Sequence, residues 1–167
     1  LEADMGGGPA FDYLLSKGKD ANRLFFRSGK VRAGSGQLEL SQRDVEVIGA
    51  LAKRIREAGM QFAGYQDLIR IPGSEKLAVK YLHILQSEGR IRKIGGEGYM
   101  DSGVFDDIKK RLARILSSSG SISVGEFKDE FGLSRKYAVP LLEHLDSEGI
   151  TVRKGDSRVA GPALQEV

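Results

Sequence analysis

Five cations near the end of the chain are the residues best suited to chemistry: Arg135, Lys136, Arg153, Lys154 and Arg158. Guanidinium and ammonium groups form charge-assisted hydrogen bonds with phosphate oxygens, and their contacts release counterions from a polyanion. Two of the five stand together at a predicted helix start, and three fall in a short segment with the pattern of a hairpin. The pattern therefore indicates binding of an anionic backbone rather than bond making or breaking.

The charges of one predicted helix run against its dipole. Arg135 and Lys136 open this helix, and three acids close it: Glu143, Asp146 and Glu148. The dipole favours the reverse arrangement, and a sequence that works against local stability often marks function. The start of this helix and the tip of the hairpin that follows it are expected to lie together in the fold. We therefore expect the five cations to form one patch. The alternative is a solvated basic face without a partner.

These cations belong to the second copy of an internal repeat with an offset of sixty residues. Helix-spaced apolar positions coincide at Val45/Phe105, Ile48/Ile108, Ala52/Leu112 and Ile55/Ile115. The same offset pairs Ser74/Ser134, Lys76/Lys136, Ala78/Ala138, Leu82/Leu142, Leu85/Leu145, Ser87/Ser147, Glu88/Glu148 and Gly89/Gly149. One offset kept over this span indicates two copies of one supersecondary unit.

In the first copy, Ser41 is expected to cap a helix that carries Val45, Ile48, Ala52 and Ile55 inward and ends at Gly59. A short helix follows over 66–70 and ends before a proline. A third helix is expected from Ser74 to Gly89, and the segment 90–100 has the pattern of strand, glycine turn and strand.

The second copy repeats this order with a capping box at Ser123 and Glu126. Ser134 is expected to cap the third helix, which contains Pro140 near its sixth position. Strands are predicted at 150–154 and 157–159, joined by a Gly155–Asp156 turn. Three helices followed by a hairpin are the plan of a winged helix. The fold class is therefore predicted as α+β, mainly helical, with tandem winged-helix domains.

Domain boundaries follow from the repeat. We expect winged helices over 41–101 and 104–160, with a tail over 161–167. Residues 1–40 are predicted to be a linker and the C-terminal half of a preceding winged helix, whose hairpin would turn near Ser28-Gly29. Because the chain begins with Leu1, the sequence is expected to be a fragment or a processed product.

The amino-acid composition restricts which other classes of protein this chain can belong to. There are no cysteines, which excludes disulfides and thiolate chemistry, and no apolar run approaches the roughly 20 residues of a membrane span. A net charge of +3 permits a polyanionic partner. We therefore expect a soluble, cytoplasmic and monomeric protein that has no contact with a membrane.

Catalysis is not indicated. His83 and His144 stand on predicted third helices without the spacing of metal ligands, and Ser28-Gly29-Lys30 lacks the earlier glycine of a phosphate-binding P-loop. We expect no enzyme activity, no metal and no cofactor. Tyr137 could stack on an unpaired base or pack in the core, and the packing role is slightly favoured.

Two segments resemble a known family: Phe127 to Asp146, with its Ser134-Arg-Lys-Tyr-Ala138 stretch, and the wing Arg153-Lys-Gly-Asp-Ser-Arg158. They are similar to the C-terminal region of the bacterial selenocysteine-specific elongation factor SelB. The segment Gln37 to Ser41 resembles the junction between that family's second and third winged helices. The family wing commonly has paired arginines, and here Lys154 follows Arg153.

The resemblance implies a messenger RNA partner, a selenocysteine insertion sequence hairpin, with the ribosome as a further partner of the full-length factor. It places eight residues on the RNA-binding surface: Ser134, Arg135, Lys136, Tyr137, Arg153, Lys154, Asp156 and Arg158. It also implies that GTP and magnesium belong to a GTPase domain that this sequence lacks. Two other hypotheses stay open, a winged-helix DNA-binding transcriptional regulator and a protein-interaction scaffold.

Overall fold

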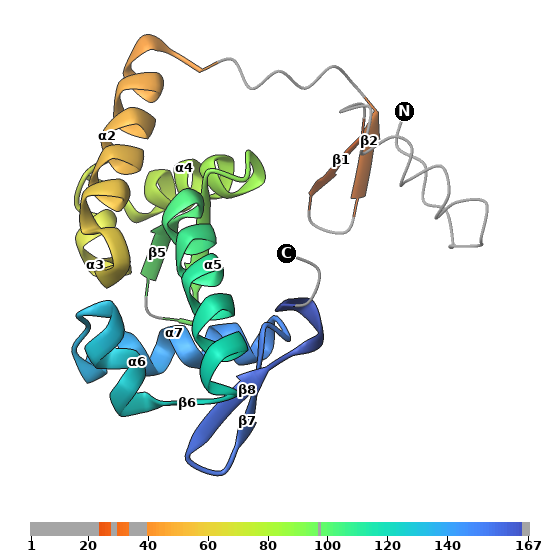
Figure 1. Cartoon of the computed structure of the whole chain (residues 1–167). Helices are drawn as coiled ribbons and strands as arrows, with labels where there is room; N and C mark the ends of the chain where they lie inside the picture. Colours follow the sequence, from red (N-terminus) through yellow and green to blue (C-terminus); the bar gives the residue numbers. More distant parts are fainter. Residues whose placement is uncertain (1–23, 28–29, 34–39, 97, 165–167) are drawn as a thin grey trace. The chain divides into compact units, whose positions relative to one another are not determined.

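The computed structural model of this chain describes residues 24–27, 30–33, 40–96 and 98–164 (Figure 1). The chain divides into two compact units, Leu1–Ser41 and Gln42–Val167. In the first unit, β1 (Leu24–Arg27) pairs antiparallel with β2 (Lys30–Ala33), and Arg27 lies opposite Lys30. The predicted N-terminal hairpin is thus confirmed. The rest of the predicted half of a preceding winged helix lies outside the described residues.

The second unit begins with the first copy of the repeat. Its helices are α2 (Gln42–Ala58), α3 (Tyr65–Leu68) and α4 (Glu75–Ser87). Its strands are β3 (Ala63–Gly64), β4 (Ile91–Ile94) and β5 (Gly98–Asp101), in the sheet order β3-β5-β4. The predicted helices and hairpin are confirmed, with α3 ending two residues early. The two-residue strand β3 was not predicted because it is too short to show a period.

The second copy has the same order of elements. Its helices are α5 (Ser102–Ser119), α6 (Val124–Phe131) and α7 (Arg135–Ser147). The strands β6 (Ile122–Ser123), β7 (Thr151–Lys154) and β8 (Ser157–Ala160) form a sheet in the order β6-β8-β7. Lys154 lies opposite Ser157, so the predicted Gly155–Asp156 turn is confirmed. Pro140 is the sixth residue of α7, and the helix continues through it.

Caps set several helix boundaries. Ser123 and Glu126 form the predicted capping box at the start of α6. Asp101 accepts hydrogen bonds from the amides of Gly103 and Val104 at 2.9 and 3.3 Å, so α5 follows β5 without a linker. Ser74 and Ser134 occupy the N-cap positions of α4 and α7, but neither side chain makes a capping hydrogen bond. The prediction that the Ser134 hydroxyl caps the third helix of the second copy is therefore wrong, although Ser134 does occupy the N-cap position.

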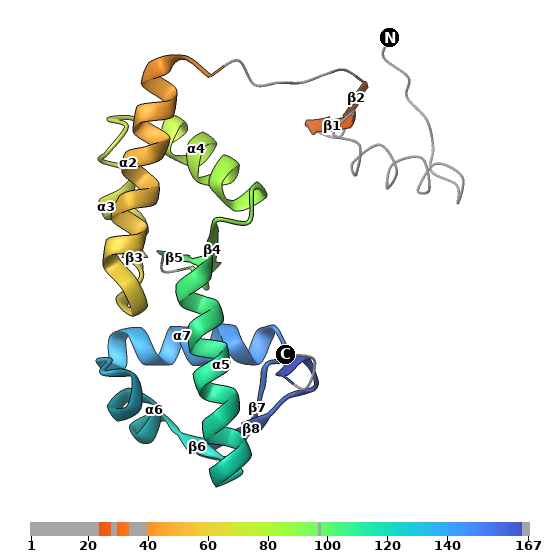
Figure 2. The same ribbon diagram turned by 45° about the horizontal axis from the view of Figure 1, so that its top comes forward.

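The core is continuous between the two copies. Phe62, Ile94 and Met100 of the first copy belong to the same buried cluster as Phe105 and Leu142 of the second. Helix α5 contacts strands of both sheets, and Figures 1 and 2 show it running from the first sheet to the second. The repeat-related positions Ala78/Ala138, Leu82/Leu142 and Leu85/Leu145 are all buried, as predicted.

The structure differs from the prediction at one face of α2 and adds a turn after the last strand. Val45 was expected inside, but its side chain is 52% exposed, because the buried stripe of α2 consists of Ile48, Leu51 and Ile55. Beyond the last strand, the turn Pro162–Leu164 packs against the second copy and buries Leu164. The amide of Ala163 donates to the carbonyl of Gly149, which links this turn to the end of α7.

Candidate nucleic-acid interface

The start of α7 presents two exposed cations on an open helix end. Arg135 and Lys136 are exposed, as is Ser134 before them. The Ser134 carbonyl accepts the amides of Tyr137 and Ala138, both at 3.0 Å, while its hydroxyl caps nothing. First-turn amides have no partner within their own helix. The positive end of the dipole therefore lies next to two positive side chains, an arrangement that favours an anionic ligand.

Tyr137 is turned toward the first copy. Its half-buried ring packs edge to face on Phe62, with ring centroids 5.2 Å apart and an interplanar angle of 84°. The ammonium of Lys136 lies 5.4 Å from the centroid of the same ring. Edge-to-face packing of this kind stabilises an aromatic pair beyond its buried area. The geometry favours the packing role over a ring that is free to stack on a base.

The wing carries Arg153, Lys154 and Asp156 at its exposed end. The Arg153 guanidinium donates through Nε to the carbonyl of Gly155 at 3.1 Å, which leaves its terminal nitrogens available to another acceptor. Side chains alternate along a strand, so Arg153 and Lys154 project from opposite faces of the hairpin. A flat ligand surface therefore contacts these two cations unequally.

Arg158 does not share the surface with the other cations. Its side chain is 5% exposed, and its Nε donates to Oδ2 of Asp146 at 3.0 Å. The other oxygen of Asp146 accepts the hydroxyl of the buried Thr151 at 2.5 Å. The expectation of five cations on one exposed patch is corrected here, because an acid near the end of α7 holds this arginine inside.

The four remaining cations form two groups. Strand β6 pairs with β8, and Ser123 lies opposite Ser157, so the wing tip lies beside the start of α6. Arg135 follows the end of α6 after a short loop. The eight residues of α6 span about 12 Å, so the two groups lie near opposite ends of this helix. In Figures 1 and 2, the end of α6 lies next to the start of α7. The start of α6 is joined to β6, which lies beside strand β8 of the wing.

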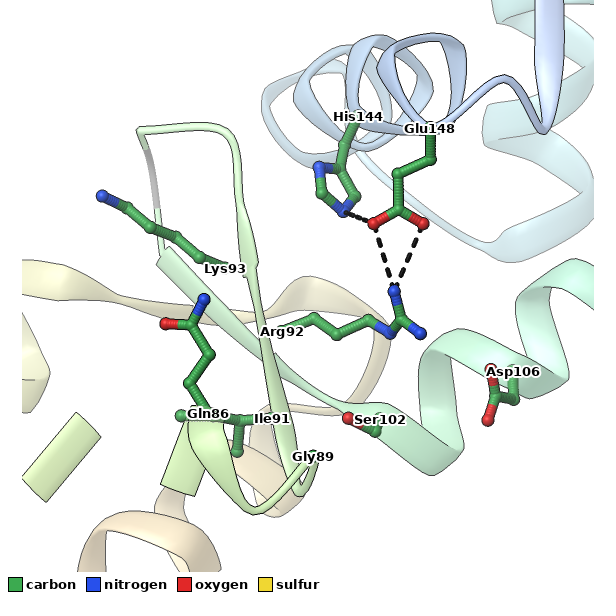
Figure 3. Close-up of a pocket in the computed structure, with 9 residues that line it drawn as sticks. All are labelled: Gln86, Gly89, Ile91, Arg92, Lys93, Ser102, Asp106, His144 and Glu148. Atoms are coloured by element: carbon green, nitrogen blue, oxygen red, sulfur yellow. Dashed lines mark hydrogen bonds and ion pairs between the residues drawn. The ribbon is translucent and has the colours of Figure 1, made fainter. Parts of the chain in front are cut away.

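A junction between the copies holds a further basic residue of the first wing. Arg92 of β4 donates through one terminal nitrogen to both carboxylate oxygens of Glu148, at 3.1 and 3.2 Å. Its guanidinium also lies 4.8 Å from the centroid of the Phe105 ring. Figure 3 shows Arg92 reaching toward Glu148, whereas Lys93 points away from it. The first wing therefore uses this cation for contact between the copies.

His144 completes this junction beside a cavity of about 400 Å³. Its Nε2 lies 3.3 Å from a carboxylate oxygen of Glu148 but makes no hydrogen bond, and its ring packs edge to face on Phe105. Burial lowers the pKa of His144, the Arg92 charge lowers it further, and the Glu148 carboxylate opposes both. The histidine is therefore neutral near pH 7, and its contact with Glu148 is not an ion pair.

Metal chemistry finds no support in the described part of the chain. Across residues 40–96 and 98–164, no group of three or more histidine, aspartate and glutamate side chains is arranged to hold a metal ion. None of the described helices is long and apolar enough to cross a membrane.

Comparison with known proteins finds a family model that is similar to part of the second copy. Residues 114–160 match the family model for the winged helix of elongation factor SelB. The match covers the end of α5 and the rest of the second copy through β8. A selenocysteine-specific elongation factor from Desulfomicrobium baculatum is 35% identical over 83 residues, which are 50% of this chain and 13% of that protein. The factor from Escherichia coli strain K12 is 26% identical over 100 residues, or 59% of this chain and 16% of the relative.

Solved structures show the same fold. The mRNA-binding domain of Escherichia coli SelB, solved in complex with SECIS RNA, superposes with a TM-score of 0.58 at 23% identity. The match covers 70% of this chain and 98% of that one. A bacterial selenocysteine-specific elongation factor superposes with a TM-score of 0.54 at 21% identity, over 90% of this chain and 24% of the other. The predicted resemblance to the C-terminal winged-helix region of SelB is confirmed.

Proposed function

We propose that this chain binds a messenger RNA hairpin of the selenocysteine insertion class and tethers a translation factor to it in the cytoplasm. The observation that carries the proposal is the pair of exposed cation groups, one on the open start of α7 and one on the wing. Both lie in the segment that matches the SelB winged helix. The related Escherichia coli domain was solved with SECIS RNA, which supports the same ligand class here.

The charge distribution along α7 favours a hairpin end over a duplex groove. Only the first turn of this helix carries exposed cations, and Glu143 and Glu148 are exposed farther along it. A recognition helix laid along a DNA major groove would bring these acids toward phosphates. Single-stranded loops and bulges are the usual targets of sequence-specific RNA binding, because their bases are not buried in a deep groove. We therefore propose contact by the helix end and the wing.

The role is binding rather than catalysis, and we propose that it needs no cofactor. Ser134, Arg135 and Lys136 would contact the RNA from the helix end, and Arg153, Lys154 and Asp156 from the wing. Tyr137 would support the helix through its contact with Phe62. Contacts with the ribosome and the delivery of an aminoacyl-tRNA would belong to other parts of a longer factor.

Fluorescence anisotropy of labelled nucleic acids would test this function. The probes are a bacterial SECIS hairpin, the same hairpin with its loop replaced, a fully paired RNA stem and a DNA duplex, each titrated with the whole chain at several salt concentrations. We expect the native hairpin to bind most tightly. Arg135→Ala and Arg153→Ala should each weaken its binding by about 1 to 3 kcal/mol if they meet bases or close phosphates.

Lys110→Ala is the matched control, because it removes an exposed cation of α5 that pairs with Asp107 of the same helix. It should change hairpin affinity little. If Arg135→Ala and Arg153→Ala behaved like Lys110→Ala, the proposed interface would be wrong. Tighter binding to duplex DNA would favour the transcriptional regulator, and no binding to any nucleic acid would favour the interaction scaffold.

A further inference from the structure

Arg158 combines burial with a full positive charge. The side chain is 5% exposed, and its Nε donates to one carboxylate oxygen of Asp146 at 3.0 Å, while Thr151 donates to the other at 2.5 Å. A buried charge is costly unless it is paired, and removing one partner leaves the other uncompensated. These three side chains, here called the wing anchor, therefore hold both strands of the wing against the end of α7.

The wing anchor lies directly beside the exposed arginine of the wing. Arg153 and Arg158 are opposite each other in the β7–β8 register, and Thr151 lies two residues before Arg153 on the same strand. Residues opposite each other in an antiparallel pair project from the same face. The same face therefore carries Thr151, Arg153 and Arg158, with two like charges adjacent. Asp146 draws one of these charges inward, and the other remains at the surface.

The turn of the wing also helps to orient the Arg153 side chain, through a hydrogen bond to its backbone. Its Nε donates to the carbonyl of Gly155 at 3.1 Å. Gly155 has φ of +62°, a conformation that suits glycine. The anchor and the turn together leave the terminal nitrogens of Arg153 as the part that can meet a ligand.

We propose that the wing anchor sets the direction of Arg153, so that Arg158 is a positioning residue for RNA binding and not itself an RNA contact. The inference rests on the proposed function for its ligand, a hairpin RNA. Its structural part concerns only the wing. Loss of Asp146 would release the Arg158 guanidinium toward Arg153, and repulsion between the two would turn Arg153 away from its place. Loss of Arg158 would leave the Asp146 carboxylate without its cation, and attraction to that carboxylate would displace Arg153 as well.

A double-mutant cycle on hairpin binding tests the inference. Arg153→Ala and Arg158→Met should each weaken binding to the SECIS hairpin about tenfold, and the double variant should also be about tenfold weaker. Arg158→Lys should stay within about threefold of the parent, because an ammonium can still pair with Asp146. Arg111→Met is the control. It breaks the 2.6 Å ion pair with Glu130, which lies near the end of α6 opposite the wing, and should leave affinity unchanged.

A double variant about a hundredfold weaker would show independent contacts and overturn the positioning role. Unchanged affinity in Arg158→Met would overturn it as well, and so would a loss in Arg158→Lys equal to that in Arg158→Met. The conclusion about Arg158 would then be that it contacts RNA directly or contributes nothing.

NMR of arginine Nε–H groups tests the structural part without RNA. We expect the Nε–H of Arg158 to exchange slowly with solvent in the parent. The isosteric variant Asp146→Asn should speed this exchange and shift the Nε–H signal of Arg153. An unshifted Arg153 signal would overturn the inference even if Arg158→Met failed to fold. Absence of hairpin binding by the parent would instead refute the proposed function and leave the NMR result standing.

Discussion

Phe62 combines an unusual backbone conformation with a buried ring at the contact between the two copies. Its backbone has φ of 29° and ψ of 150°, outside the regions that residues with a Cβ ordinarily occupy. Its ring is 6% exposed and packs against Tyr137. Replacing Phe62 by alanine removes the ring and keeps the Cβ, whereas replacing it by glycine removes both. Comparing the two variants therefore separates packing from backbone strain.

The expected free energies of unfolding follow from these two terms. Truncating a buried phenylalanine costs about 3 to 5 kcal/mol, of which the ring pair with Tyr137 is a part. A non-glycine residue in this backbone region costs about 1 to 3 kcal/mol, and glycine avoids that cost. Glycine lowers the free energy of unfolding by about 0.5 to 1 kcal/mol, because it loses more conformational entropy on folding than alanine does. We therefore expect Phe62→Ala to lose about 4 kcal/mol and Phe62→Gly about 3 kcal/mol.

Urea unfolding followed by far-ultraviolet circular dichroism would measure both values. The control is Phe127, a fully buried residue in the interior of α6. There the usual order should hold, with the alanine variant more stable than the glycine variant by about 1 kcal/mol. If Phe62→Ala also proved more stable than Phe62→Gly, the strain assigned to Phe62 would be refuted.

Two further predictions concern titration and capping. Because the pKa of His144 is lowered by burial and by Arg92 against the opposing Glu148, the unfolded state binds more protons in the window just below about pH 6.5. Stability should therefore fall as pH decreases through that window, and thermal melts of His144→Gln should lack this component. Ser123→Ala should lose about 1 kcal/mol with its capping box, whereas Ser134→Ala, which loses no capping bond, should melt close to the parent.

Local signals in the sequence predicted most of the fold. Ser123 and Glu126 set the start of α6, and glycines with positive φ follow helix ends at Gly89 and Gly149. The sixty-residue repeat identified the buried positions of both third helices, because a core face must recur when a unit is duplicated. Pro140 did not disturb the prediction, since α7 continues through it.

Contacts between residues that lie far apart in the chain could not be predicted from the sequence. Arg158 and Asp146 are twelve positions apart on different elements, so strand alternation could not distinguish a buried arginine from an exposed one. The ion pair of Arg92 with Glu148 joins residues 56 positions apart. The contact of Tyr137 with Phe62 likewise depends on how the two copies pack. Such pairs are determined by tertiary packing, which leaves no periodic trace in the chain.

The Arg92 junction gives the two copies of the repeat a fixed order. Sixty residues after Arg92 stands Val152, which is 42% exposed, and sixty before Glu148 stands Glu88, which pairs with Arg90 of its own copy. One copy thus offers the arginine and the other accepts it, so the contact is heterologous rather than self-complementary. A designed chain with the two copies exchanged would set a valine against a glutamate, and its halves would lose this means of recognising each other.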